Sequence, residues 1–201
     1  MKRTGVAATL VITTILILSL PAAQAATITF TAPLSGATEI PPTGSSGTGF
    51  AMVVLDTTAQ TLLVSVNFSG LTGTTTASHI HCCLPAPFQN ANEPVATQVP
   101  TFLNMPLAVT SGSFTQTLDL TLASSYNPAF VTLEGGTVSG AEMALITGLE
   151  NEETYLNIHT TTFPGGEIRG LLVPTPEPTS ILLLGSGLVG LVCARLRVRR
   201  S

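Results

Sequence analysis

The stretch GFAMVVLDTTAQTLLVSVNF, residues 49–68, decides the fold class of this chain of 201 residues. Two apolar runs rich in β-prone residues flank the polar residues 57–60, which is the pattern of a hairpin. The second run carries a period-two stripe that ends at Val66 and Phe68. Such alternation is what a half-buried strand requires, so the stretch predicts two antiparallel strands.

The rest of the central region repeats this pattern, because Thr, Val, Leu and Gly dominate and turn residues divide the apolar runs. Further strands are predicted over residues 27–34, 77–82, 113–122, 154–160 and 167–173. Ser139 followed by Glu142 fits a capping box and predicts one short helix. The predicted fold is all-β, an antiparallel β-sandwich of the immunoglobulin-like or superoxide-dismutase-like kind with that one helix.

The first 25 residues have the features of a secretory signal peptide. Lys2 and Arg3 precede an apolar stretch, and the small residues Ala23 and Ala25 frame a cleavage site. We expect signal peptidase to cut before Ala26, and an uncleaved N-terminal membrane helix is the alternative. The folded domain is therefore expected to span residues 26–173.

Residues 174–201 form a second targeting segment. The motif Pro176-Glu177-Pro178 precedes an apolar run over residues 180–194, which is followed by a basic tail. As a helix this run of 15 residues is about 22 Å long, shorter than a comfortable membrane span. The basic tail is expected to stay on the cytoplasmic side and to leave the domain outside. Its charges are Arg195, Arg197, Arg199 and Arg200.

This three-part tail closely resembles the PEP-CTERM sorting signal of Gram-negative bacteria over residues 175–201. The resemblance implies that an exosortase-type membrane protease cuts at Pro176-Glu177-Pro178 and releases or re-anchors the protein. It also implies only transient attachment to the inner membrane, a final place at the cell surface or outside the cell, and an association with exopolysaccharide.

The charge of the central domain excludes one class of partner. Residues 26–173 hold ten carboxylates against a single basic residue, Arg169, so their net charge is −9. A surface of this sign repels nucleic acid and anionic lipid. No nucleic-acid partner is therefore expected.

Polar side chains concentrate on three of the predicted strands. Side chains alternate along a strand, so His79 and His81 share one face, and Asn157 and His159 share one face of another strand. Glu167 and Arg169 flank an apolar residue in the same way. If these strands are neighbours, we expect their polar faces to form one cluster.

Two interpretations of this cluster are open. In the first, His79, His81 and His159 bind copper or zinc, because imidazole suits both metals. Cys82 and Cys83 are further candidate ligands, with Asn157 or Glu167 behind the ligands. In the second, the side chains form a structural polar network: Glu167 pairs with Arg169 or a histidine, and Asn157 and His159 bond backbone carbonyls, since buried polar groups are generally hydrogen-bonded.

The adjacent residues Cys82 and Cys83 have three open states: free thiols, a strained redox disulfide between them, or an intermolecular bridge. Cys193 lies in the predicted membrane segment and is not expected to be their partner.

The central domain also resembles a CHRD domain, named from chordin, from about residue 28 to residue 172. The segments that carry the resemblance are Glu39-Ile40-Pro41-Pro42 with Gly47 and Gly49, His79-Ile80-His81, Tyr155-Leu156-Asn157-Ile158-His159-Thr160 and Gly166-Glu167-Ile168-Arg169-Gly170. The resemblance implies an extracellular β-rich domain. It implies no growth-factor role, because fold and motif do not fix activity.

The sequence shows no nucleophile elbow or catalytic triad, so no enzymatic activity is expected. The leading functional hypothesis is a structural or adhesive protein of the cell surface or extracellular matrix. The alternative is a copper- or zinc-binding or redox module that uses the histidines and the two cysteines.

Overall fold

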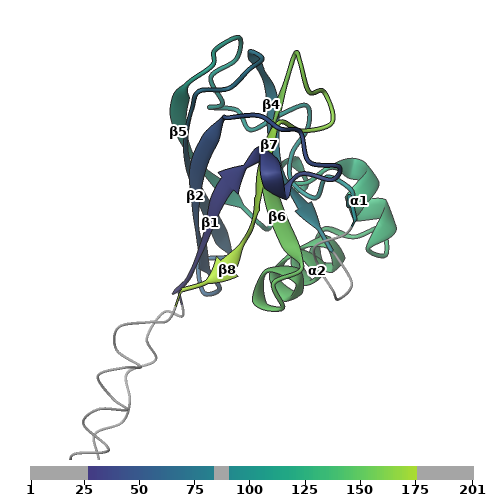
Figure 1. The fold of residues 1–201 in the computed structure, drawn as a ribbon. Helices are drawn as coiled ribbons and strands as arrows, with labels where there is room; N and C mark the ends of the chain where they lie inside the picture. The colour runs from purple at the N-terminus through teal and green to yellow at the C-terminus, as the bar shows by residue number, and fades with distance from the viewer. Residues whose placement is uncertain (1–26, 84–90, 176–201) are drawn as a thin grey trace, which may run out of the picture.

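The computed structural model describes residues 27–83 and 91–175 (Figure 1). The predicted signal peptide, the sorting motif and the predicted membrane segment at 180–194 lie outside the described residues. Within the two described ranges, no helix has the length and apolar character needed to cross a membrane.

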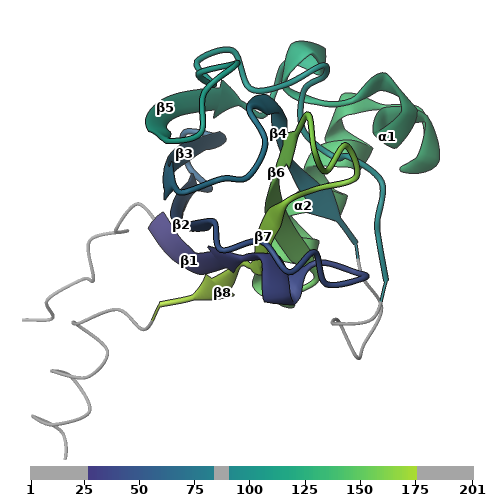
Figure 2. The same cartoon turned by 45° about the horizontal axis from the view of Figure 1, so that its top comes forward.

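The described strands form one antiparallel sheet that curls around an apolar interior (Figure 2). In chain order they are β1 (Thr27–Ser35), β2 (Thr48–Asp56), β3 (Thr61–Ser69), β4 (Thr75–Cys82), β5 (Gly112–Asp119), β6 (Thr154–Thr160), β7 (Ile168–Leu171) and β8 (Val173–Pro174). Their spatial order is β4-β6-β7-β1-β2-β3-β5, and β8 pairs with β1 beside this path.

The predicted antiparallel β class is confirmed, but the sheet is continuous where the sandwich prediction implied two separate sheets. The reason lies in β1, which pairs with β2 along its whole length and with β7 through Ser35 and Arg169. These pairings join the two halves of the sheet at its centre. One curled sheet therefore surrounds the core where two stacked sheets were predicted.

The hairpin predicted from residues 49–68 is confirmed as β2 and β3, which pair from Thr48 with Ser69 to Asp56 with Thr61. The carboxylate of Asp56 accepts hydrogen bonds from the backbone amides of Thr58 and Ala59. An aspartate that bonds the backbone two and three residues ahead stabilises a turn, which explains where the hairpin reverses.

Residues 27–83 and 91–175 contain two α-helices where one was predicted for the domain: α1 (Pro128–Leu133) and α2 (Val138–Glu150). Asn127 caps α1 through the amide of Ala129, and proline occupies the first turn. The prediction that Ser139 caps the longer helix is wrong by two residues. Its N-cap is Thr137, whose hydroxyl accepts from the amide of Gly140. The short 3₁₀ helices η1 (Gly36–Thr38) and η2 (Ala123–Ser125) complete the described elements.

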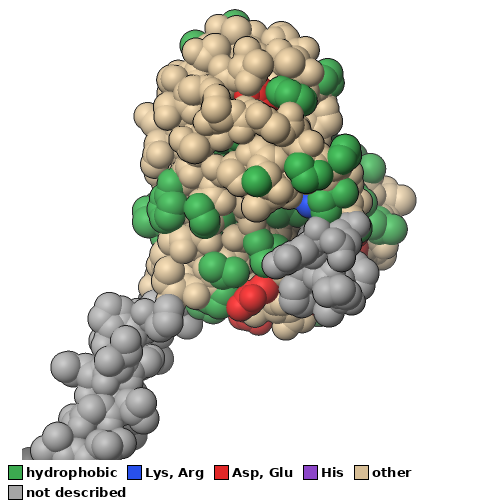
Figure 3. Space-filling view, in the orientation of Figure 1, with side chains coloured by type: hydrophobic (Ala, Val, Ile, Leu, Met, Phe, Trp, Pro, Cys, Tyr) green, Lys and Arg blue, Asp and Glu red, His purple; other side chains and the backbone are tan. Residues whose placement is uncertain are grey.

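The alternation of side chains decides which face of the sheet is apolar. On β4 and β6, Ile80, Leu156 and Ile158 are fully buried in the core, together with Leu145 and Leu149 of α2. The histidines of the same strands therefore point to the opposite face. Apolar side chains also reach the surface in scattered places (Figure 3), and Leu103 and Met143 are among the most exposed.

β8 pairs with β1 and so places the end of the described chain beside its beginning. Phe30 lies opposite Pro174 and Thr31 opposite Val173. Beyond the strand, the backbone amide of Thr175 donates to the carbonyl of Thr29 at 2.8 Å. The two ends of the described chain are thus neighbours (Figure 1).

Candidate metal centre

The three histidines come together because β4 and β6 are adjacent and antiparallel. In their register Ala77 lies opposite His159, His79 opposite Asn157, and His81 opposite Tyr155. One ring nitrogen from each of the three histidines lies within 4.8 Å of the other two. The predicted gathering of these polar faces is therefore present in the structure for His79, His81 and His159, here called the histidine cluster.

Each imidazole of the histidine cluster is held from behind by a backbone carbonyl. The contacts are His79 Nε2 with Pro100 O at 2.7 Å, His81 Nδ1 with Glu93 O at 2.5 Å, and His159 Nδ1 with Pro164 O at 2.8 Å. A carbonyl oxygen only accepts hydrogen bonds, so each of these nitrogens carries the proton in the neutral ring. The other nitrogen of each ring is then left with a free lone pair.

These lone pairs face one another inside the histidine cluster. The Nδ1 atom of His79 lies 3.3 Å from Nε2 of His159. Two nitrogens bound to one tetrahedral ion, each at about 2.0–2.1 Å, lie about 3.3 Å apart. The spacing of this pair therefore suits two ligands of a single ion, and His81 completes the set after a shift of its ring.

The histidines are neutral near pH 7. Burial lowers the pKa of His79 to about 4 and the pKa of His81 to about 4, against the raising effect of the carbonyl contacts. Burial also lowers the pKa of His159. Metals bind the neutral imidazole, so the cluster has no proton to lose before an ion enters.

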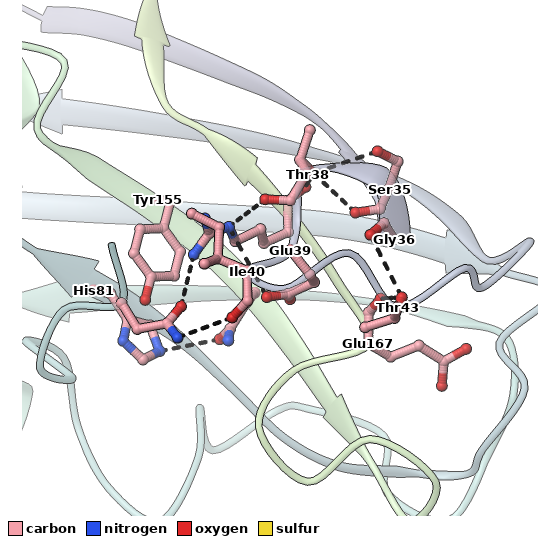
Figure 4. A network of polar contacts seen from close by, with 12 residues as sticks. Ser35, Gly36, Thr38, Glu39, Ile40, Thr43, His81, Tyr155 and Glu167 are labelled. Carbon is pink, nitrogen blue, oxygen red and sulfur yellow. Dashed lines mark hydrogen bonds and ion pairs between the residues drawn. The ribbon is translucent and has the colours of Figure 1, made fainter. Parts of the chain in front are cut away.

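The ring of Tyr155 lies against His81 on one side (Figure 4), and the guanidinium of Arg169 lies over the Tyr155 ring. The ring of Tyr155 stacks on the ring of His81 with centroids 4.6 Å apart and planes 9° apart. The guanidinium carbon of Arg169 lies 4.6 Å from the centroid of the Tyr155 ring, a cation–π contact. The backbone amide of Glu93 donates to the Tyr155 hydroxyl at 3.1 Å, and its carbonyl accepts from His81. The loop at Glu93 therefore contacts both the Tyr155 and the His81 side chains.

Glu39 is the second buried charge of this region. Its side chain is 4% exposed, and Oε2 lies 3.9 Å from Nε of Arg169. Its other oxygen, Oε1, has no hydrogen-bond partner. Burial raises the pKa of Glu39 to about 7, although the charge of Arg169 acts to lower it.

Glu167 lies apart from His81, as Figure 4 shows. Its carboxylate accepts from four donors: the hydroxyls of Ser45 and Thr160 and the backbone amides of Thr72 and Gly73. Burial acts to raise the pKa of Glu167, but these hydrogen bonds together lower it. Glu167 therefore does not lie behind the metal ligands, and its partners are not Arg169 or a histidine, as the two interpretations expected.

The two other predicted polar residues do adjoin the cluster. Asn157 and Arg169 lie opposite each other on β6 and β7, and Oδ1 of Asn157 is 3.1 Å from Nε2 of His81. Sequence reasoning gave no role to Tyr155 or Glu39. The signal for Tyr155 was its place on the same strand face as Asn157 and His159, whereas Glu39 stood out only as part of a segment that carries the CHRD resemblance.

Cys82 and Cys83 form a disulfide with each other. Their sulfur atoms lie 3.8 and 3.5 Å from the carbonyl of Ala144 in α2, and a Cβ on Gly148 would be 2.4 Å from Cys82 Sγ. They therefore pack against the helix and contribute no ligand atom to the three-histidine group. Cysteine ligands do not fit this disulfide state, because the metal ligand is the thiolate.

Comparison with known families accounts for nearly the whole described chain. The CHRD domain matches residues 30–172, and the PEP-CTERM protein-sorting motif matches residues 174–200. Neither the curated proteins nor the solved structures provide a match. A PEP-CTERM motif indicates export and membrane-linked sorting toward the cell surface by exosortase-type machinery. The chain therefore belongs to the CHRD domain family and carries a PEP-CTERM sorting signal.

Proposed function

We propose that this CHRD domain is an extracellular metal-binding module in which His79, His81 and His159 hold one zinc or copper ion. The observation that carries the proposal is the direction of the hydrogen bonds. All three rings donate outward to backbone carbonyls, which leaves three lone pairs pointing at one small volume. Outer partners that fix the tautomer and orientation of an imidazole are a regular part of metal sites.

The charges and burial of the region also support a cation. Three neutral imidazoles have no charge of their own, while the domain carries a net charge of −9. Zinc and copper both accept imidazole nitrogen, and neither needs the cysteines for this site. The proposal is of a binding module and includes no catalytic step.

The sorting signal supports a place of action. We propose that signal peptidase and an exosortase-type protease process the chain, that the inner membrane holds it only in transit, and that the domain binds metal at the cell surface or outside the cell. The structural or adhesive role and the association with exopolysaccharide stay predictions. They are checked by comparing the surface attachment of cells that make the wild-type protein with cells that make His79→Ala.

The metal proposal is tested on the exported protein, purified after processing and freed of metal. Titration with zinc and with cuprous copper against a competing chelator is expected to give one ion per chain. His79→Ala and His159→Ala are each expected to raise the dissociation constant more than about 100-fold, since each removes a ligand.

The double variant Cys82→Ser with Cys83→Ser is the matched control. It is expected to leave the dissociation constant within about threefold, because the sulfur atoms lie outside the histidine cluster. The absence of a stoichiometric ion in the wild-type protein would overturn the proposal. A loss of binding in the cysteine variant equal to that in His79→Ala would contradict the assignment of ligands.

A further inference from the structure

Asn157 presents an atom to the histidine cluster that the hydrogen-bond pattern leaves unexplained. Its Oδ1 lies 3.1 Å from Nε2 of His81, and its side chain is 1% exposed. Nδ1 of His81 donates to the carbonyl of Glu93, so Nε2 carries a lone pair in the neutral ring. An amide oxygen also only accepts. Two acceptors therefore face each other at hydrogen-bond distance with no proton between them.

The same situation occurs a second time, between Nδ1 of His79 and Nε2 of His159 at 3.3 Å. One pair is buried and the other partly buried, so facing acceptors are unfavourable there and a cation among them would remove that cost. Both separations are close to the edge of a tetrahedral ligand set, which is about 3.3 Å. The four atoms thus have the chemistry of a coordination shell: two of their separations already fit a tetrahedral ion, and His81 approaches the other histidines after a shift of its ring.

The orientation of the Asn157 amide has its own support. A Cβ placed on Gly166 would lie 2.9 Å from Nδ2 of Asn157 and 2.5 Å from Oε1 of Glu39, so both atoms are packed against this glycine. The oxygen of Glu39 is the buried carboxylate atom with no hydrogen-bond partner. No hydrogen bond joins the two atoms, but an amide nitrogen is more favourable near a carboxyl oxygen than an amide oxygen is, because two oxygens repel each other. Glu39 therefore favours the orientation that leaves Oδ1 facing His81.

We propose that Oδ1 of Asn157 is the fourth ligand of the metal centre and that Glu39 is a positioning residue that orients the Asn157 amide. This inference rests on the proposed function and adds a ligand and a selectivity to it. The resulting shell has three imidazole nitrogens and one amide oxygen. Four protein ligands close a tetrahedral site, so the centre holds its ion and offers no open position for a substrate.

The oxygen ligand also selects among ions. Carbonyl oxygen is a hard ligand, which borderline zinc accepts beside imidazole nitrogen, whereas cuprous copper favours soft ligands and gains little from it. Zinc is therefore expected to use all four ligands, and cuprous copper to depend on the imidazoles alone. Loss of the amide oxygen should weaken zinc binding and leave cuprous binding nearly unchanged.

The test compares zinc and cuprous dissociation constants for the wild-type protein, Asn157→Leu and Asn157→Asp, all in the exported, metal-free form. Asn157→Leu keeps the volume of the side chain and removes its oxygen. It is expected to weaken zinc binding by about 10–100-fold and to change cuprous binding by less than about threefold. Asn157→Asp keeps the oxygen and adds a charge, so it is expected to bind zinc at least as tightly as the wild type.

Glu39→Gln tests the positioning role by the same two readouts. The variant keeps the shape of the side chain but loses the charge that orients the amide, so zinc binding is expected to weaken about fivefold with cuprous binding unchanged. Equal losses of both ions in Asn157→Leu would show a structural role and overturn the inference. Unchanged zinc binding in Asn157→Leu, or weaker zinc binding in a folded Asn157→Asp, would also overturn it. A wild-type protein that binds neither ion would instead overturn the proposed function itself.

Discussion

Two buried polar regions lie beside the same strands and differ in how their hydrogen bonds are satisfied. The Glu167 carboxylate receives four donors from three separate parts of the chain. The histidine cluster and Asn157 hold acceptors that face acceptors, and Glu39 beside them has an oxygen with no partner. The hydrogen bonds of the first region are complete within the protein, and under the proposed function a cation completes the second.

Under the proposed function, this difference separates a site that stabilises the fold from a site that binds a metal ion. A buried carboxylate with four donors contributes to the fold, because the charge is compensated where it is desolvated. Acceptors without donors raise the free energy of the unbound folded protein, and a bound cation would lower it again. Variants of the two regions are therefore expected to affect different measurements: unfolding for Glu167 and metal affinity for the histidines.

The largest expected effect is that of Glu167→Gln on stability. The amide nitrogen of glutamine would meet donors from Thr160, Thr72 or Gly73, and the charge-assisted bonds would be lost. We expect the free energy of unfolding to fall by about 4 kcal/mol, measured by urea denaturation.

The matched control for that variant is Glu142→Gln, whose carboxylate makes one exposed hydrogen bond with Gln60. A change within about 0.5 kcal/mol is expected there. Zinc affinity of folded Glu167→Gln should equal that of the wild type. A loss of stability below about 1 kcal/mol would remove the contrast between the two regions.

The next effect is the stabilisation of the histidine region by its ion. Zinc at 100 times its dissociation constant is expected to raise the free energy of unfolding by about 2.7 kcal/mol, because it binds only the folded state. His159→Ala should abolish this gain while changing the metal-free protein by about 1 kcal/mol or less, since His159 is only half-buried. Thermal unfolding with and without zinc measures both quantities. An equal gain in His159→Ala would place the ion elsewhere.

Gly166 packs against both Glu39 and Asn157, so its substitution is expected to affect stability and zinc binding together. Its φ is +130°, and a Cβ would meet Oε1 of Glu39 and Nδ2 of Asn157. We expect Gly166→Ala to cost about 2 kcal/mol of stability and to weaken zinc binding. Gly165→Ala is the control, because a Cβ there meets nothing within 4 Å. Equal behaviour of the two variants in unfolding and zinc titration would contradict this explanation.

The smallest expected effect is on the pH dependence of the metal-free protein. The pKa values of His79 and His81 fall to about 4 on folding, so their contribution is complete above pH 6.5 and is lost as the pH falls toward 4. The pKa of Glu39 rises to about 7, so its contribution is complete below about pH 4.5 and is lost as the pH rises through 7. Between pH 5 and 6.5 two histidines outweigh one glutamate.

The free energy of unfolding should therefore decrease by about 1 kcal/mol for each unit of pH lost in that window. Urea denaturation at pH 6.5 and 5.5 measures this slope. Glu39→Gln removes the opposing group, and we expect it to make the slope steeper. A slope of the opposite sign would show that the histidines do not dominate.

Much of the fold was predictable because its signals are local. The strand from Thr154 to Thr160 was predicted to the residue, since alternation within seven residues defines it. The continuous sheet was not predictable, because it depends on pairing between β1 and β7, more than a hundred residues apart. The six-residue helix α1 is too short for periodicity to reveal, and only the Asn127-Pro128 start marked it.

The candidate site, like the fold, was predictable only where its signals are local in the sequence. The alternation of side chains along a strand predicted which faces His79, His81 and His159 occupy. The carbonyls of Glu93, Pro100 and Pro164 that orient the rings come from loops, and any residue type supplies such a carbonyl. The buried partner Glu39 lies more than a hundred residues from Asn157, so no local pattern joins them.

The pairing of β8 with β1 has a consequence for the processing of the chain. The predicted signal-peptidase site precedes β1 by a single residue, Ala26, and the sorting motif begins at Pro176, one residue after Thr175 bonds to Thr29. Both proteases would therefore cut at one corner of the sheet with almost no slack in the chain. A mature protein trimmed at both points would have no free arms, and any re-attachment at Pro176 would hold the domain to its support by that corner alone.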